Sequence, residues 1–165
     1  MSAKLKLSIA VLLSLLVSAC GFQLRGQADL PPQMAQTYIA GTAADEGIGL
    51  ELALLLQASG VEVVATPEAA SAVFNARHVA NKRRVLSVSG AAEVSEYELA
   101  LLVTFSVQGR ANDFTVEEQT ITITRQYLHD PTSLLGISQE EADLVEEMQR
   151  DAARLIIFRL AAARQ

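Results

Sequence analysis

The stretch VSEYELALLVTFSVQ, residues 94–108, decides the fold of this chain. Its side chains alternate between two sides. One side carries Tyr97, Leu99, Leu101, Val103, Phe105 and Val107, and the other carries Glu96, Glu98, Thr104, Ser106 and Gln108. A period of two is that of a β-strand, whose successive side chains point to opposite faces. The stretch therefore predicts a long strand with one face on a core and the other in more polar surroundings.

The sequence around this stretch predicts further strands. Residues rich in Val, Ile, Thr, Phe and Tyr recur at 37–40, 61–65, 72–79, 85–88 and 116–127. These residue types favour the pleated, half-buried surface of a sheet. Turn-forming sequences at 89–92 and 108–113 join consecutive strands, so we expect a sheet that is mostly antiparallel.

Two helices are predicted beside the sheet. Residues 45–59 place Leu52, Leu55 and Leu56 on one helical face, and Gly60 follows as a stop. A second helix closes the chain. Ser138 with Glu141 resembles a capping box at its start. Its apolar stripe consists of Val145, Met148, Ala152, Leu155, Ile156 and Leu160. Two helices on one face of a sheet form an α/β two-layer sandwich and leave the other sheet face for solvent or for a partner.

The N-terminus has the order of a secretory signal peptide over residues 1–19. Lys4 and Lys6 precede an apolar run, residues 7–17, that is shorter than the ~20 residues a membrane-spanning helix needs. Cys20 is the only cysteine and stands directly after Ser18 and Ala19, in a sequence that resembles the bacterial lipobox. A buried core cysteine would not sit at a cleavage boundary. We therefore expect Cys20 to carry the lipid of an exported lipoprotein. Because Gly21 rather than aspartate follows it, we expect delivery to the outer membrane.

The remaining chain predicts one domain. Residues 20–33, with Pro31 and Pro32, are expected to tether the lipid to the body without packing into it, and residues 34–165 suffice for a single core. The formal net charge is −6. Nucleic acid is disfavoured as a partner, because binding its phosphates requires a basic surface.

Catalytic and metal-binding patterns are weak. The sequence has no Gly-x-Ser-x-Gly elbow, and its only histidines, His78 and His129, lie far apart in the sequence. Acids recur at 140, 141, 143, 146, 147 and 151. Paired catalytic carboxylates or a calcium site are possible there, but the first turns of a solvated helix explain the acids better. We expect no catalytic residues, no metal, no cofactor and no enzymatic activity.

Lys82, Arg83 and Arg84 form the one dense basic cluster. They are predicted to lie between two strand segments, where their side chains would converge on an anionic group such as a phosphate-bearing lipid. A solvated turn is the alternative.

Several segments together resemble the lipopolysaccharide (LPS)-assembly lipoprotein family, and the likeness spans most of the chain after the signal peptide. They are residues 20–26 (CGFQLRG), 95–99 (SEYEL), 125–127 (RQY), 135–136 with 139–140, and 146–148 with 151–153. The resemblance implies two helices on a four-stranded sheet. It also implies a non-enzymatic outer-membrane lipoprotein that plugs and helps assemble the LPS-inserting (LptD-like) β-barrel in a one-to-one complex, and that takes part in LPS transport.

The resemblance also implies LPS binding by basic residues near the loop end of the sheet. The segments 89–92 and 134–137 carry no cation here, so Lys82, Arg83 and Arg84 are the candidate LPS-binding residues. A stand-alone lipoprotein that binds an envelope ligand, without a barrel partner, is the alternative function.

Overall fold

The computed structural model describes residues 28–41, 47–88, 90, 94–111, 114–128 and 134–163, without the side chains of 78 and 134–138. The described helices and strands are η1 (Pro32–Met34), β1 (Gln36–Gly41), α2 (Ile48–Ala58), β2 (Glu62–Val63), η2 (Pro67–Ala69), β3 (Ala72–Val88), β4 (Val94–Gly109), β5 (Thr115–Leu128) and α3 (Leu134–Ala162). Cys20 and His129 lie outside the described residues.

The sheet is mixed and has five strands in the order β2-β1-β3-β4-β5. β1 pairs in parallel with both β2 and β3, whereas β3, β4 and β5 pair antiparallel. The prediction of four mostly antiparallel strands is therefore wrong in the strand count and in the pairing of β1. Both neighbours of β1 run parallel to it because α2 carries the chain from β1 back to the start of β2, and the segment with η2 carries it from β2 to the start of β3.

β3 is one continuous strand, although the sequence predicts two segments with a basic connection. The charged residues between them pair in register with β4, where Lys82 faces Ala100 and Arg84 faces Glu98. Because β4 offers a regular ladder from Val79 to Val85, the chain stays extended there despite its polar composition.

The alternation predicted for residues 94–108 is confirmed. Leu99, Leu101, Val103, Phe105 and Val107 are all buried, whereas their neighbours on the other face are half-buried or exposed. The buried residues form one core with Phe74 of β3, whose ring stacks on Phe105 with centroids 5.5 Å apart. This core lies between the sheet and the two helices.

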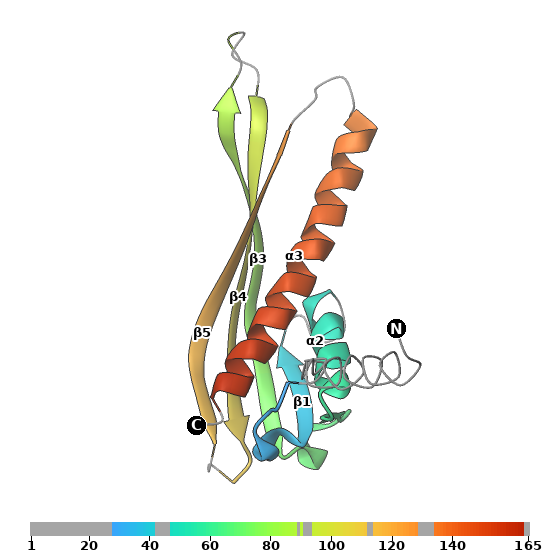
Figure 1. Ribbon diagram of the computed structural model, residues 1–165, viewed down its shortest axis with the longest axis vertical. Coiled ribbons are helices and arrows are strands. Elements are labelled where there is room, and N and C mark those ends of the chain that lie inside the picture. Colours follow the sequence, from blue (N-terminus) through green and yellow to red (C-terminus); the bar gives the residue numbers. More distant parts are fainter. Residues whose placement is uncertain are drawn as a thin grey trace, which may run out of the picture.

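The two helices pack on the same face of the sheet (Figure 1). In α2, Leu52 and Leu56 are buried, and Gly60, with φ +84°, follows the helix end as predicted. The stripe predicted for α3 is confirmed, since Met148, Ala152, Ile156 and Leu160 are all buried.

The start of α3 differs from the prediction. The helix begins at Leu134, so Ser138 lies inside it and the capping box with Glu141 is wrong. For the same reason the acids from 140 onward do not occupy the first turn. The capping pattern misleads here because serine and glutamate three residues apart are also compatible with a helix interior.

The segment before β1 packs on the body. Leu30 and Met34 are buried in the core, and the hydroxyl of Thr37 donates a hydrogen bond of 2.7 Å to the carbonyl of Met34. Within the segment 20–33, which is expected to tether the lipid, Leu30 packs into the core beside the end of α2.

The long strands give the molecule its shape. β3, β4 and β5 extend well past β1 and α2, accompanied at that end by α3 alone (Figure 1). We call this part, with β3 from Lys82 to Val88 and the segments paired with it, the distal end. Among the described residues, no helix combines the length and the apolar character that crossing a bilayer requires.

Candidate functional site

The three cations of the basic cluster point to two different faces of β3. Their partners in the register are Ala100 for Lys82, Leu99 for Arg83 and Glu98 for Arg84. Leu99 is on the core face, so Arg83 points toward α3, whereas Lys82 and Arg84 share the outer face. The cluster therefore presents two cations to one side of the sheet and one to the other.

Arg83 connects the sheet to α3. Its Nη1 donates to Oε2 of Glu141 at 3.0 Å, and the hydroxyl of Tyr127 donates to the same oxygen at 2.9 Å. The guanidinium lies over the Tyr97 ring, 4.8 Å from its centroid, and that ring stacks on Tyr127 with centroids 5.6 Å apart. The hydrogen bond with Glu141 raises the pKa of Arg83, and burial raises the pKa of Tyr127. Arg83 thus has a structural role already.

Arg84 is engaged as well. It forms a two-point contact with Glu98 on β4, with Nε to Oε1 at 2.6 Å and Nη2 to Oε2 at 3.1 Å. This planar pairing is the geometry in which arginine holds a carboxylate best. Lys82 forms no ion pair with any residue in the described ranges and is exposed. An anionic ligand that binds at the basic cluster would therefore meet Lys82, which has no ion-pair partner among the described residues. The two arginines of the cluster already bind carboxylates.

The Arg84–Glu98 pair makes a titration prediction. The hydrogen bond from Arg84 holds the pKa of Glu98 below its ordinary value. The Arg84–Glu98 pair therefore stabilises the fold at neutral pH, and this contribution is lost as the pH falls through the lowered pKa of Glu98. We expect Arg84→Ala to raise the pKa of Glu98 toward the ordinary value, measured by a carboxyl-carbon NMR titration.

Arg77→Ala is the matched control for this titration, because Arg77 pairs with Glu118 instead, at 3.5 Å. It should leave the pKa of Glu98 unchanged. An unchanged pKa of Glu98 in Arg84→Ala would contradict the pairing.

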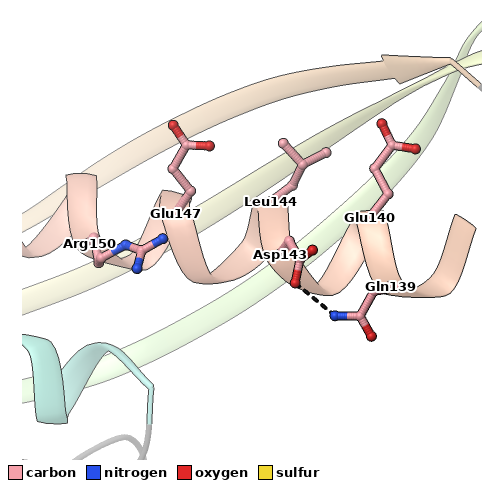
Figure 2. Close-up of a pocket in the computed structure, with 6 residues that line it drawn as sticks. All are labelled: Gln139, Glu140, Asp143, Leu144, Glu147 and Arg150. Atoms are coloured by element: carbon pink, nitrogen blue, oxygen red, sulfur yellow. Dashed lines mark hydrogen bonds between the residues drawn. The ribbon is translucent and has the colours of Figure 1, made fainter. Parts of the chain in front are cut away.

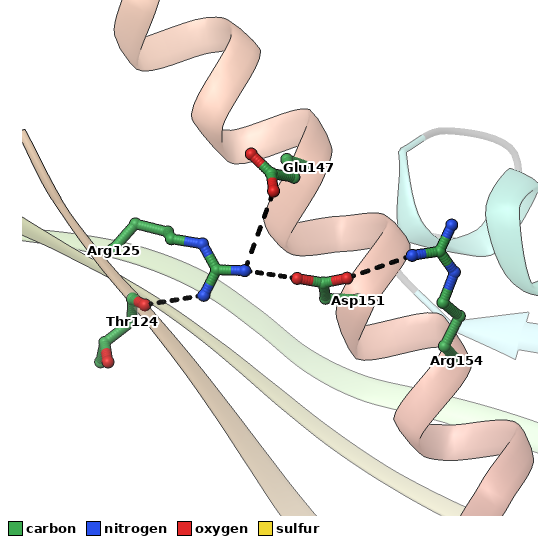
Figure 3. Close-up of polar contacts among 5 residues, drawn as sticks. All are labelled: Thr124, Arg125, Glu147, Asp151 and Arg154. Carbon is green, nitrogen blue, oxygen red and sulfur yellow. Dashed lines mark hydrogen bonds and ion pairs between the residues drawn. The ribbon is translucent and has the colours of Figure 1, made fainter.

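A second polar contact joins β5 to α3 nearer the middle of the helix (Figure 3). Nη2 of Arg125 lies 2.5 Å from Oδ2 of Asp151 and 4.0 Å from Oε1 of Glu147. Arg154 binds the other oxygen of Asp151 at 3.3 Å. The sequence marks Arg125 and Asp151 only as parts of a family resemblance. Their contact becomes visible only once the register of β5 against α3 is known.

One flank of α3 carries an acidic hollow of about 530 Å³ (Figure 2). Its lining comes from α3 alone: Gln139, Glu140, Asp143, Leu144, Glu147 and Arg150. Asp143 accepts a hydrogen bond from Gln139 at 2.8 Å, and Arg150 pairs with Glu146 at 3.1 Å. A hollow with this excess of carboxylates disfavours an anionic ligand.

The histidines and acids of the described residues do not gather into a metal site. No group of three or more His, Cys, Asp or Glu side chains is arranged there to hold a metal ion. His78 lies within β3, far along the sheet from the end of β5 that precedes His129.

The chain matches a model of the lipopolysaccharide-assembly family LptE over residues 34–160. The chain belongs to this family. The match covers every strand of the sheet and nearly all of α3. The predicted resemblance is therefore confirmed, and the LptE family is one of non-enzymatic lipoproteins of the bacterial envelope.

Solved structures agree with this membership. The chain is similar to rare lipoprotein B from Shewanella oneidensis, with 27% identity, a TM-score of 0.67, and coverage of 77% of this chain and 94% of that one. It is also similar to lipoprotein B from Nitrosomonas europaea, with 29% identity, a TM-score of 0.69, and coverage of 86% and 91%. A minor lipoprotein from Acinetobacter baumannii, 24% identical with a TM-score of 0.65 over 79% and 93%, shares the fold. No curated protein matches the chain in sequence.

Proposed function

We propose that this LptE-family protein is a lipid-anchored outer-membrane lipoprotein that plugs and helps assemble the LPS-inserting β-barrel in a one-to-one complex. In this role it takes part in LPS transport to the cell surface. The family match over residues 34–160 is the observation that carries the proposal. Cys20 is the proposed lipid attachment site. The body lies on the periplasmic side of the outer membrane and reaches into the barrel lumen.

The outer face of the sheet supports insertion into a lumen. Thr120, Thr122 and Thr124 of β5 are exposed there, and the hydroxyl of Thr120 lies 2.9 Å from that of Thr104 on β4. The lumen of an outer-membrane barrel is lined by polar side chains. The hydroxyl groups on the β5 part of this face can exchange hydrogen bonds with such a wall.

The edge strand β5 supports the same arrangement. It has 14 residues and is the last strand of the sheet, so its outer edge is unpaired within the described part of the chain. A long free edge invites pairing with other chains, and soluble proteins usually shield it. Enclosure in a barrel shields this edge.

Lys82, Arg83 and Arg84 are the proposed contact with LPS. Lys82 supplies a free ammonium, and Arg84 beside it on the outer face is exposed. A phosphate group there would draw on both cations while Glu98 competes for Arg84. Arg83, on the core face, acts in this proposal mainly by holding the distal end of the sheet to α3.

Replacing all three cations with alanine should weaken LPS binding by up to about 30-fold, because the two cations on the outer face, Lys82 and Arg84, each contribute up to ~1 kcal/mol. It should also flatten the salt dependence of binding. Surface plasmon resonance over immobilised LPS at several salt concentrations measures both effects. A chain with Arg77, Arg150 and Arg154 replaced by alanine loses the same charge elsewhere and should bind normally. Equal binding by both variants would remove the cluster from the proposal.

Depletion of the protein from its bacterium tests the assembly role. The amount of correctly folded barrel, resolved by semi-native electrophoresis, should fall, because the barrel lacks its plug during folding. Restoring the wild-type chain should restore the barrel. Normal barrel levels after complete depletion would refute the assembly role.

A further inference from the structure

The helix α2 is mostly apolar on both its inner and its outer side. Its only charged residue is Glu51, which is half-buried. The inner side packs into the core through Ile48, Leu52 and Leu56, and on the opposite side Leu50 and Leu54 remain 57% and 55% exposed. An amphipathic surface helix carries polar residues on its outer side, whereas a helix that is apolar all round is covered on both sides. The outer side of α2 is therefore a surface built for an apolar contact.

The composition of this outer side indicates which kind of partner it can contact. Its exposed residues are Leu50, Leu54, Gln57 and Ala58, none of which carries a charge, although the whole chain has a formal charge of −6. Leu50 and Leu54 are four residues apart and lie one turn above the other on the helix. Acidic side chains elsewhere would be repelled by an anionic lipid surface. The exposed residues on the outer side of α2 include no acid, so an anionic lipid surface does not repel them.

The path of the chain places the lipid anchor near this helix. The described chain starts at Ala28, and the segment from Ala28 to Ala35 borders the C-terminal end of α2 at Ser59–Val61. Leu30 fixes that segment to the core. The eight residues from Cys20 to Ala28 reach at most roughly 28 Å. Because α2 has 11 residues and is about 17 Å long, a lipid on Cys20 holds the membrane surface within reach of the whole helix.

We propose that the face formed by Leu50 and Leu54 rests on the phospholipid surface into which the Cys20 lipid inserts. The inference rests on the proposed lipid anchor and names a second membrane contact of the same protein. Two contacts, one acyl and one on the folded body, fix an orientation that an acyl chain alone leaves free. α2 packs beside β1, away from the distal end of β3, β4 and β5 (Figure 1), and its Leu50 and Leu54 face away from the core, so the lipid contact is on the helical side of the molecule.

Spin labels on the full acylated protein test this contact. Acylation consumes the thiol of Cys20, the only cysteine, so Leu54→Cys introduces a single reactive thiol. The labelled protein is reconstituted in vesicles of phosphatidylethanolamine and phosphatidylglycerol, and the collision rates of the label with oxygen and with a water-soluble nickel chelate are compared. Leu128→Cys is the matched control, because Leu128 is 71% exposed at the distal end of β5.

We expect the oxygen-to-nickel ratio to be several-fold higher at residue 54 than at residue 128. A ratio at residue 54 that favours nickel, as at residue 128, would overturn the proposal, as would protection that appears only when a barrel protein is added. Circular dichroism of both labelled variants shows whether the fold is kept, and Leu50→Cys offers a second position on the same face.

Mass spectrometry of the N-terminal peptide separates the two proposals. An unacylated Cys20 refutes the anchor. Because Cys20 then keeps a reactive thiol, the label at residue 54 is read in a Cys20→Ser background, where a lipid-facing label still supports the α2 contact and a water-facing label refutes it. An acylated Cys20 with a water-facing label at residue 54 keeps the anchor and rejects the contact.

Discussion

Phe105→Ala should lower the free energy of unfolding by about 3–5 kcal/mol. Phe105 is fully buried in the middle of β4, on the core face. Its ring stacks on Phe74 of the neighbouring strand β3, so truncation removes an aromatic pair as well as buried area. The strands on both sides hold the backbone in place, and the surroundings can close only part of the resulting cavity.

Urea unfolding followed by circular dichroism measures this loss, with Leu128→Ala as the control. Leu128 is on the outer face of β5 and 71% exposed, so its removal should change stability by no more than about 0.5 kcal/mol. Similar midpoints for the two variants would mean that Phe105 does not occupy the core.

Gly41→Ala should destabilise the fold by about 3 kcal/mol or more, because two costs add. Gly41 has φ +114°, a conformation that a residue with a Cβ rarely adopts. An added Cβ would also overlap the backbone carbonyl of Ala76, its partner on β3, with the carbonyl carbon only 2.9 Å away. Backbone in a sheet cannot move aside as a flexible side chain can, so the β1–β3 pairing must distort.

Gly60→Ala measures the cost of the positive φ without the cost of a steric overlap. Gly60 has φ +84°, but nothing lies within 4 Å of an added Cβ. Its replacement should therefore cost only the conformational strain, about 1–2 kcal/mol. Thermal unfolding of both variants tests the comparison, and a larger loss in Gly60→Ala than in Gly41→Ala would contradict the close approach of β1 and β3.

Local patterning predicted the parts of the fold that depend on neighbouring residues. The two faces of β4 and the apolar stripe of α3 follow from side-chain period, which is a property of the backbone geometry alone. The continuity of β3 through Lys82–Arg84 was not predicted, because it depends on a partner strand distant in the sequence. The parallel pairing of β1 depends in the same way on where α2 returns the chain.

The residues that carry the family resemblance meet in the structure. Tyr97 stacks on Tyr127, and Arg125 binds Asp151, so segments from β4, β5 and α3 join at the contact between the sheet and the long helix. The sequence motifs therefore describe how α3 is held against the sheet.

The basic cluster shows the limit of reading charge from sequence. Three consecutive cations predict convergence on one ligand, but strand alternation sends Arg83 to the face opposite Lys82 and Arg84. Acidic partners from two other elements, Glu98 and Glu141, then engage both arginines. These partners are distant in the sequence, so nothing near the cluster indicates them.

The central claim, that this protein plugs an outer-membrane barrel, is tested most directly by what copurifies with it. The protein carries a C-terminal affinity tag. Membranes are extracted in mild detergent, the tagged protein is captured, and its companions are quantified by mass spectrometry against an unrelated tagged lipoprotein. We predict one large β-barrel protein in a one-to-one ratio. A protein that elutes alone would contradict the plug and favour the stand-alone, ligand-binding lipoprotein.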